Sequence, residues 1–293
     1  MPEAGEYLLT NAGFSSMEKP VVSFQSNNSF VDFEPPGEAI TFRFDMSQRF
    51  CVGWRNITTG ERFSCPDHHF VESKYEQCPA CQSRTGFNPA FYHATSVSEQ
   101  QEARNQEPHM LYLARFGRGV IKVGISHAKR GNARLLEQGA RDALILETFP
   151  SAHIARQYEA KIAALPDIAE SLQLRKKLVL LTQSYDHTEG VNELEATRER
   201  VEEALGATFP KNDVLCLDDV YFPYDVPTLS EGHDCSKQNT LSGTAIGMLG
   251  TILFCIYKDS PVFLPLKKYI GYNVAFSQEE TALVLPAQQT SLF

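Results

Sequence analysis

The stretch Leu111–Ser126, LYLARFGRGVIKVGIS, contains two short apolar runs on either side of the glycine-rich turn Gly117–Gly119. Runs of this length that meet at such a turn are typical of a β-hairpin. Lys122 lies inside the second run, where a buried strand has little reason to carry a charge. Its ammonium group is therefore expected either to reach solvent along an exposed strand face or to face a negative group.

The segments after this hairpin alternate between helix and strand. The stretch AKRGNARLLEQGA is expected to be helical from Asn132, and ALILETF forms a third strand. Ser151 then caps a helix. Its apolar positions are Ile154, Tyr158, Ile162 and Leu165. Asp167 with Glu170 resembles the capping box of another helix, and a last helix, ELEATRERVEEAL, ends at Gly206.

Changes in composition divide the chain into three parts and a linker. Residues 1–94 alternate short strand-like runs with turns, and residues 95–108 are polar and rich in helix breakers. Residues 109–206 hold the hairpin and the helices, and residues 207–293 return to short apolar runs. The glycines at 243, 247 and 250 favour bulges or tight packing over a phosphate loop. We therefore expect an α+β protein with an α/β core between two β modules.

Four cysteines in the first part form a candidate metal site. Cys78 and Cys81 make a C-x2-C pair, whereas Cys51 and Cys65 stand singly at turns. Four thiolates suit the tetrahedral geometry of zinc, and a closed site of this kind is structural. His68 or His69 could replace one of the single cysteines.

The cysteines could also serve in redox chemistry or in core packing. A redox C-x2-C pair beside buried free thiols is the alternative to zinc, but such pairs usually open a helix next to a strand, and no such pattern follows here. Cys216, Cys235 and Cys255 are scattered, and core packing explains them best.

The chain of 293 residues is long enough for two or three modules around a sizeable core. The N-terminus lacks the features of a signal peptide, and the longest apolar run, Ile246–Tyr257, has 12 residues. A membrane span needs about 20 apolar residues. These features predict a cytoplasmic protein without a membrane partner.

The net charge of −9 argues against a protein that coats duplex DNA. Residues 109–142, however, carry a net charge of +5, which leaves −14 for the rest of the chain. A local basic region in an acidic protein indicates either an anionic ligand at that place or a solvated, charge-rich helix face.

The order of these motifs resembles the GIY-YIG nuclease domain, in a divergent branch. The first motif corresponds to LYLA with Tyr112, and the second to KVGIS with Lys122 in place of the usual tyrosine. The resemblance places the helix arginine at Arg134, with Arg130 as the other candidate, and the acidic residue at Glu159. The cysteine pattern, EQGA at Glu137–Ala140 and LSGTAIGMLGTILF are also similar to an uncharacterised bacterial domain-of-unknown-function family (2797).

The GIY-YIG resemblance implies metal-dependent cleavage of a phosphodiester bond. Tyr112, or a water that it activates, would attack the phosphate, and Arg134 would neutralise the developing charge. Glu159 would hold Mg²⁺ or Mn²⁺. Lys122, projecting to the same face as Tyr112, would lower the pKa of its hydroxyl and contact phosphate. The basic side chains expected to bind nucleic acid are Arg118, Lys129, Arg130 and Arg134.

Simpler interpretations and other functions stay open. Tyr112 could be an ordinary amphipathic strand residue, and Glu159, near Arg156 and Lys161, a solvated helix charge. His153 and His187 are only candidates for the family's downstream partner residue. The functions expected are an endonuclease acting on RNA or on structured or single-stranded nucleic acid, a non-catalytic (tRNA-)binding protein, a tRNA-dependent transferase, or a zinc-stabilised protein-interaction module.

Overall fold

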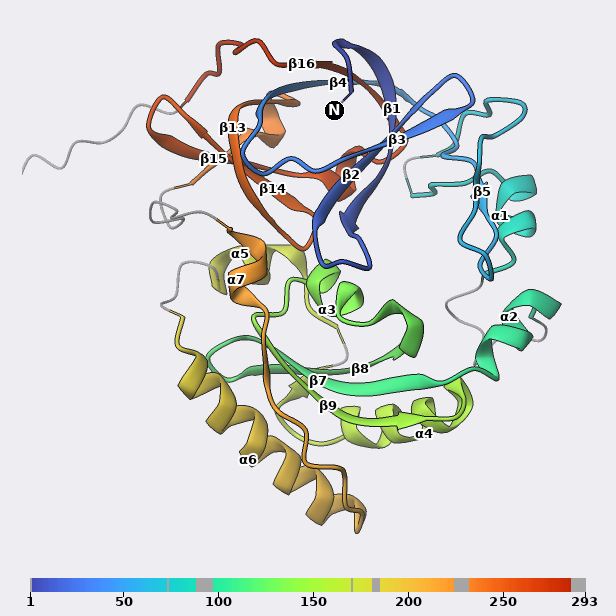
Figure 1. Ribbon diagram of the computed structural model, residues 1–293, viewed down its shortest axis with the longest axis vertical. Helices are drawn as coiled ribbons and strands as arrows, with labels where there is room; N and C mark the ends of the chain where they lie inside the picture. The colour runs from blue at the N-terminus through green and yellow to red at the C-terminus, as the bar shows by residue number, and fades with distance from the viewer. Residues whose placement is uncertain are drawn as a thin grey trace, which may run out of the picture.

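The structure is a computed structural model that describes residues 2–72, 74–87, 97–169, 171–180, 185–223 and 232–285. These residues form three β-sheets, of nine, five and two strands, together with several helices. Figure 1 shows the nine-stranded sheet (the large sheet) above the five-stranded one (the central sheet), with the two-stranded hairpin at the side. The predicted α+β class is confirmed.

The large sheet is built from both ends of the chain. Its strands are β1 (Gly5–Phe14), β2 (Pro20–Ser26), β3 (Ser29–Phe33), β4 (Ala39–Arg49), β12 (His233–Asp234), β13 (Thr240–Leu249), β14 (Ile252–Tyr257), β15 (Ser260–Pro265) and β16 (Tyr272–Ser277). Strand β4 pairs antiparallel with β13 on one side and β16 on the other. The structure therefore differs from the expected separate N- and C-terminal β modules, because the backbone groups of β4 find their partners in the C-terminal strands.

The central sheet contains the predicted hairpin. Its strands are β7 (His109–Gly117), β8 (Val120–His127), β9 (Asp142–Phe149), β10 (Ile168–Ala169) and β11 (Leu215–Cys216). β7 lies in the middle and pairs antiparallel with β8 and β9, while β10 pairs parallel with β8. Every residue of β7 is buried, because helices and the large sheet cover its two faces.

Helices cover both faces of the central sheet. They are α3 (Ala133–Gln138), α4 (Ala152–Ala163), α5 (Leu174–Leu180), α6 (His187–Leu205) and α7 (Asp218–Tyr221), with the short 3-10 helix η1 (Ala128–Arg130) before α3. Figure 1 places α3 between the two sheets, and α4 and α6 on the outer side of the central sheet. The predicted cap at Ser151 and the helix end at Gly206 are confirmed.

Two local predictions are wrong. Asp167 does not cap a helix, because its backbone is left-handed (φ 65°) and the next residues form β10 against β8; Glu170 lies outside the described residues. Ile154 is 37% exposed, so that predicted apolar position of α4 faces solvent.

A smaller unit connects the two sheets along the chain. It comprises β5 (Trp54–Arg55), β6 (Arg62–Phe63) and α1 (Pro79–Thr85), and we call it the cysteine module. Helix α2 (Glu99–Asn105) lies in the expected linker, where Ser98 caps it by accepting a hydrogen bond from the backbone of Gln101. Part of the expected linker is therefore a short polar helix.

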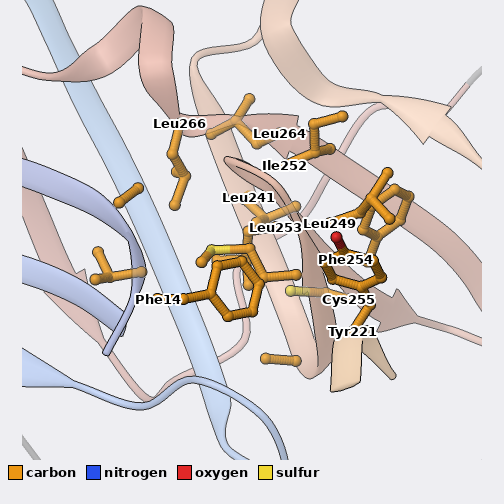
Figure 2. Packing of buried hydrophobic residues seen from close by; sticks show 14 of the residues in the cluster. Phe14, Tyr221, Leu241, Leu249, Ile252, Leu253, Phe254, Cys255, Leu264 and Leu266 are labelled. Atoms are coloured by element: carbon orange, nitrogen blue, oxygen red, sulfur yellow. The ribbon is translucent and has the colours of Figure 1, made fainter. Parts of the chain in front are cut away.

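The two sheets share one hydrophobic core. Leu135 and Leu136 of α3 pack into the same cluster as the large sheet, together with Tyr112 and Phe116 of β7. Figure 2 shows this packing where Phe14 approaches Tyr221, with ring centroids 5.7 Å apart. The opposite face of the central sheet packs on α4 and α6 in a second cluster. The shared core holds α3 in place, and α3 carries part of the candidate site.

Two 3-10 helices, η3 (Cys235–Lys237) and η4 (Leu266–Tyr269), complete the large sheet region. The bulge expected near the C-terminal glycines is confirmed, since the register of β13 against β14 shifts between Ala245 and Gly247. In the part of the chain that the structure describes, no helix has the length and apolar character needed to cross a membrane.

Candidate functional site

Four cysteine side chains meet in and beside the cysteine module. Their sulfur atoms lie within 4.8 Å of one another and each residue is at most 3% exposed; they are Cys51, Cys65, Cys78 and Cys81. Four thiolates at this spacing are a ligand set that zinc favours in closed structural sites. The cluster can therefore hold a metal ion such as zinc, as the cysteine pattern predicts.

Neighbouring residues help to decide between a four-cysteine metal site, a site with a histidine ligand and a redox C-x2-C pair. His68 and His69 are exposed, and the group of four is complete without them. Cys78 caps the short helix α1, so the expected absence of a helix is wrong and does not exclude a redox pair here. What argues for a metal site is instead the nearness of Cys51, whose sulfur accepts a hydrogen bond from the backbone N–H of Cys78 at 3.2 Å.

Local sequence explains how the cysteine module folds. Gly53 has φ +82°, and a side chain there would overlap the carbonyl oxygen of Phe63, so the turn requires glycine. Trp54 stacks on Phe63 with ring centroids 4.1 Å apart. These contacts hold the β5–β6 hairpin between Cys51 and Cys65 and bring both thiols toward the C-x2-C pair.

A second candidate site surrounds the hydroxyl group of Tyr112. Tyr112 is 1% exposed, and its hydroxyl accepts a hydrogen bond from the side-chain amide of Gln138 at the end of α3. The carbonyl end of the same amide accepts a hydrogen bond from Lys122 Nζ at 2.7 Å. Tyr112 and Lys122 thus lie on one face of the central sheet, as the hairpin predicts, and Gln138 joins them.

Arg134 and Glu159 also act on the Tyr112 hydroxyl. Burial raises the pKa of Tyr112; the charge of Arg134, with a hydrogen bond from its guanidinium, opposes this shift, and the charge of Glu159 adds to it. Because the net shift is upward, the predicted lowering of this pKa by Lys122 is wrong. The lysine contacts Gln138, and in the free protein the site favours the neutral phenol.

Gln138 is a site residue that the sequence interpretation missed. It belongs to the EQGA stretch, Glu137–Ala140, whose sequence indicates only the family resemblance and no chemical role for Gln138. The residue is 8% exposed, and both the oxygen and the nitrogen of its side-chain amide form hydrogen bonds. A glutamine in the last turn of a short helix gives no chemical signal by itself, so only the fold assigns it to the site.

Glu159 is not a solvated helix charge. The residue is 7% exposed and forms an ion pair with Arg156, one turn earlier on α4. A buried carboxylate needs such a partner, because desolvation otherwise favours its neutral form. Among the described residues, the four cysteines form the only group of three or more potential metal-ligating side chains. Glu159 would thus hold a cation alone, and only after Arg156 releases it.

The basic residues predicted to bind nucleic acid all have carboxylate neighbours. The pairs are Lys129–Glu107 at 2.6 Å, Arg130–Glu137 at 2.5 Å, Arg134–Glu137 at 3.7 Å and Arg118–Glu189 at 3.1 Å. Glu107 and Glu189 come from outside residues 109–142. Tertiary structure therefore partly neutralises the local charge excess seen in the sequence, although Lys129 and Arg118 remain exposed (78% and 80%).

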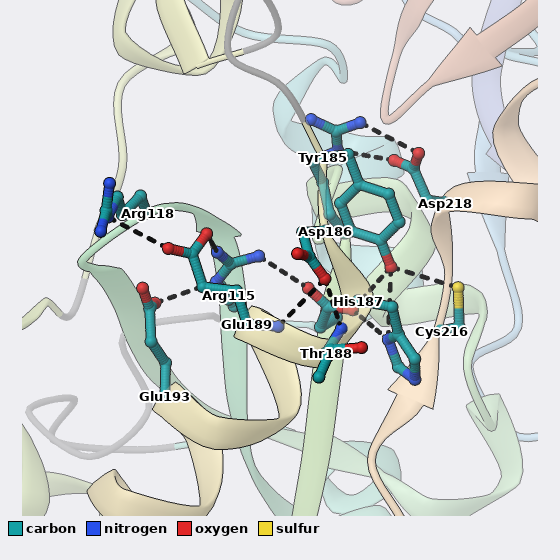
Figure 3. Close-up of polar contacts among 12 residues, drawn as sticks. Arg115, Arg118, Tyr185, Asp186, His187, Thr188, Glu189, Glu193, Cys216 and Asp218 are labelled. Atoms are coloured by element: carbon teal, nitrogen blue, oxygen red, sulfur yellow. Dashed lines mark hydrogen bonds and ion pairs between the residues drawn. The ribbon is translucent and has the colours of Figure 1, made fainter.

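Arg115, also counted in the basic region, is structural. Its side chain is 3% exposed and contacts the fully buried Asp142 at 3.1 Å, and it also pairs with two glutamates of α6, Glu189 and Glu193 (Figure 3). Asp142 accepts a further hydrogen bond from His187 at 2.7 Å. His187, one of the candidates for a downstream partner residue, thus belongs to this buried network.

Two arginines outside the predicted basic region lie close to it. Arg104 of α2 donates a hydrogen bond to the carbonyl of Ile57 in the cysteine module. Burial and then the charge of Arg130 lower the pKa of Arg55, and burial and then the charges of Arg55 and Arg130 lower that of Arg104. Three arginines from distant sequence positions are therefore within electrostatic range where the cysteine module meets η1.

Two shallow hollows on the large sheet, of about 350 and 320 Å³, lie elsewhere. Glu6 and Asn273 line both, and neither hollow contains a residue of the Tyr112 site.

A comparison of the sequence with curated proteins found no match, and neither did a comparison with solved structures. One family model matches residues 37–274, which is most of the chain, and its description is "Protein of unknown function (DUF2797)". The region includes both the cysteine cluster and the Tyr112 site. The chain therefore belongs to the DUF2797 family.

Proposed function

We propose that this protein processes nucleic acid, as a metal-dependent endonuclease whose phosphodiester-cleaving site surrounds Tyr112. The observation that carries the proposal is the hydrogen-bonded group around the Tyr112 hydroxyl, which accepts from Gln138 while Lys122 contacts the same amide at 2.7 Å. Arg134 of α3 and Glu159 of α4 lie within electrostatic range of this hydroxyl. A nucleophile or water-activating group, a cation and a carboxylate around one oxygen are the parts that phosphodiester cleavage requires.

The roles of these side chains follow from their chemistry. Tyr112 would position or activate the attacking oxygen, and Arg134, whose side chain is 40% exposed, would neutralise charge that develops on the phosphate. Glu159 would hold Mg²⁺ or Mn²⁺, which polarises the phosphodiester when bound. Because phosphate and metal would both compete for these charges, the Arg156–Glu159 pair is expected to open when substrate binds.

The strand order supports the same proposal. An antiparallel β8–β7–β9 arrangement with α3 between β8 and β9 and α4 after β9 is the order that the GIY-YIG resemblance implies. Gly124 faces Tyr112 directly across the hairpin, so the glycine of the second motif lies opposite the tyrosine of the first. The structural zinc proposed at the cysteine cluster would stabilise the module beside this core.

A second candidate function is nucleic-acid binding without cleavage. The observation in its favour is that Tyr112 is 1% exposed and Glu159 is already paired with Arg156, so neither group is open to solvent. The basic side chains around η1 and α3, those of Lys129, Arg130 and Arg134, would then contact phosphates on their own.

The deciding experiment is incubation with tRNA, single-stranded RNA and branched DNA in Mg²⁺ or Mn²⁺, with EDTA as the control. We expect wild type to cut at least one substrate. Glu159→Gln and Tyr112→Phe should each reduce the rate by roughly two powers of ten or more while keeping the fold. Glu203→Gln, exposed on α6, and Tyr158→Phe are the matched controls and should cut normally. Cleavage by Glu159→Gln at the wild-type rate would exclude this active site.

A separate binding experiment tests the second candidate function. Reversal of Lys129, Arg130 and Arg134 to glutamate should abolish binding, and each lost phosphate contact should reduce the log–log salt slope by about 0.7–0.9. A control triple reversal uses the exposed lysines of the large sheet, Lys237, Lys258 and Lys268. Circular dichroism checks that both variants fold. Binding without cutting by wild type would favour the second function over the first, and unchanged affinity in the first triple variant would place the binding surface elsewhere.

A further inference from the structure

Lys177 lies beside the Tyr112 site, on a helix that sequence analysis did not connect with it. It belongs to α5, and its ammonium group donates a hydrogen bond to the backbone carbonyl of Gln138. Lys122 donates to the side-chain carbonyl of the same residue, at 2.7 Å. Two ammonium groups from different elements therefore converge on Gln138, whose amide N–H contacts Tyr112.

The charges around Lys177 are mainly positive. Burial, followed by the charges of Lys122 and Arg134, lowers the pKa of Lys177 to about 8. Within the described residues, no carboxylate lies within 4.0 Å of its ammonium group. Lys177 contacts α3 at Gln138, and the acid of that helix, Glu137, already pairs with Arg130 and Arg134.

Such an arrangement is unfavourable without an anion. The charges of Lys122 and Arg134 repel the ammonium group of Lys177, and burial removes part of its hydration. An anion that enters among them relieves the repulsion and raises the pKa of the buried ammonium group. Phosphate fits best, because it accepts hydrogen bonds from several donors and lysine binds it as a compact charge.

We propose that Lys122, Arg134 and Lys177 together bind one phosphate group beside Gln138, and that Lys177 is a phosphate-binding residue of this site. This inference rests on the proposed function for its ligand, a phosphate of nucleic acid, but phosphate binding itself does not require that the protein cleave. The opposing interpretation is that Lys177 only anchors α5, since its ammonium group also lies over the Phe116 ring, 5.2 Å from the centroid.

Among the described residues, titratable and charged groups from four other elements lie around this site. They are Tyr112 on β7, Lys122 on β8, Arg134 and Glu137 on α3, and Glu159 on α4. Burial, followed by the charges of Lys122 and Arg134, places the pKa of Lys177 near neutral pH, at about 8. Phosphate affinity is therefore expected to fall as the pH rises from about 7 to about 9, where this ammonium group loses its proton.

The test measures binding of a short single-stranded RNA and of inorganic pyrophosphate, in EDTA so that no metal-dependent cleavage occurs. Lys177→Met should weaken both affinities roughly tenfold and lower the RNA salt slope by about 0.7. Lys176→Met, which changes the exposed neighbour on α5, should bind as wild type does. Lys177→Arg should retain binding and lose the fall in affinity up to about pH 9, because arginine keeps its charge there.

The outcomes separate this inference from the proposed function. RNA binding by Lys177→Met with wild-type affinity and salt slope, at an unchanged melting temperature, would overturn the inference and leave the proposed function standing. Pyrophosphate binding that depends on Lys177, without any binding or cleavage of nucleic acid, would support the phosphate site and reject the proposed function. Failure of wild type to bind either probe would overturn the inference as well.

Discussion

Tyr112 of β7 lies directly opposite Gly124 of β8, and a side chain at position 124 would begin 2.5 Å from the Tyr112 hydroxyl. The absence of a side chain at Gly124 is therefore what lets the tyrosine ring lie flat across the hairpin. The backbone of Gly124 does not require glycine, since no positive φ occurs there. Glycine is required at position 124 because the Tyr112 ring fills the space that a side chain would occupy. This contact links the second sequence motif to the first.

Gly124→Ala should therefore destabilise the protein through Tyr112. The added methyl group would overlap the hydroxyl and the ring carbon that carries it, both of which are held in a packed core. We expect the free energy of unfolding to fall by about 1–3 kcal/mol, as for other overpacked cores. Chemical denaturation of the variant and wild type measures this difference.

A double-mutant cycle shows whether the ring is the cause. Tyr112→Ala alone should be destabilising because it leaves a cavity. In the Gly124→Ala background the same change should cost less, since it also removes the overlap. Additive effects of the two substitutions would mean that the strain at position 124 comes from other atoms.

The cysteine cluster predicts a zinc ion that is coupled to folding. Purified protein should contain about one zinc per chain, because four thiolates form one tetrahedral site. Cys78→Ser should lose the metal and lower the melting temperature, since metal binding and folding of such modules are linked. Elemental analysis and thermal unfolding, with and without a chelator, provide the two measurements.

Cys216→Ser is the matched control for this prediction. Cys216 is a free cysteine outside the cluster, and its sulfur contacts the hydroxyl of Tyr185 at 3.2 Å, a contact that serine can preserve. The control should keep its zinc. Native protein without zinc would show that the four thiols only pack together.

Two buried histidines predict that stability depends on pH. Burial lowers the pKa of both His109 and His127, whose rings meet edge to face at 5.1 Å. The unfolded chain therefore binds more protons than the folded chain below the ordinary histidine pKa of about 6.5. Their contribution to stability is present above about pH 6.5 and is lost as the pH falls toward the lowered values.

His127→Gln isolates this contribution. Between about pH 7 and pH 5, the free energy of unfolding of this variant should fall less steeply than that of wild type, by up to about 1.4 kcal/mol per pH unit. Denaturant unfolding at several pH values provides the comparison. Carboxylates other than Glu107, whose pKa is lowered partly by its hydrogen bond to His127, contribute equally to both proteins. Parallel slopes in the two proteins would contradict the assignment of His127 as a histidine buried in its neutral form.

The sequence by itself determined the features that depend on neighbours in the chain. The hairpin at Leu111–Ser126, the cap at Ser151 and the helix end at Gly206 follow from local conformational preferences. The group of four cysteines that can hold a metal ion also follows from the sequence, because thiol chemistry is specific and the C-x2-C spacing is informative.

Only the tertiary structure decided which distant segments meet. β4 pairs with β13 and β16 because backbone hydrogen bonding sets no preference for partners near in sequence, so the two expected β modules became one sheet. The same holds for charges and contacts: Glu107 approaches Lys129, and Lys177 reaches Gln138, only after the core has packed. Burial then reversed the expected pKa shift of Tyr112, because desolvation depends on what covers a group and not on its sequence neighbours.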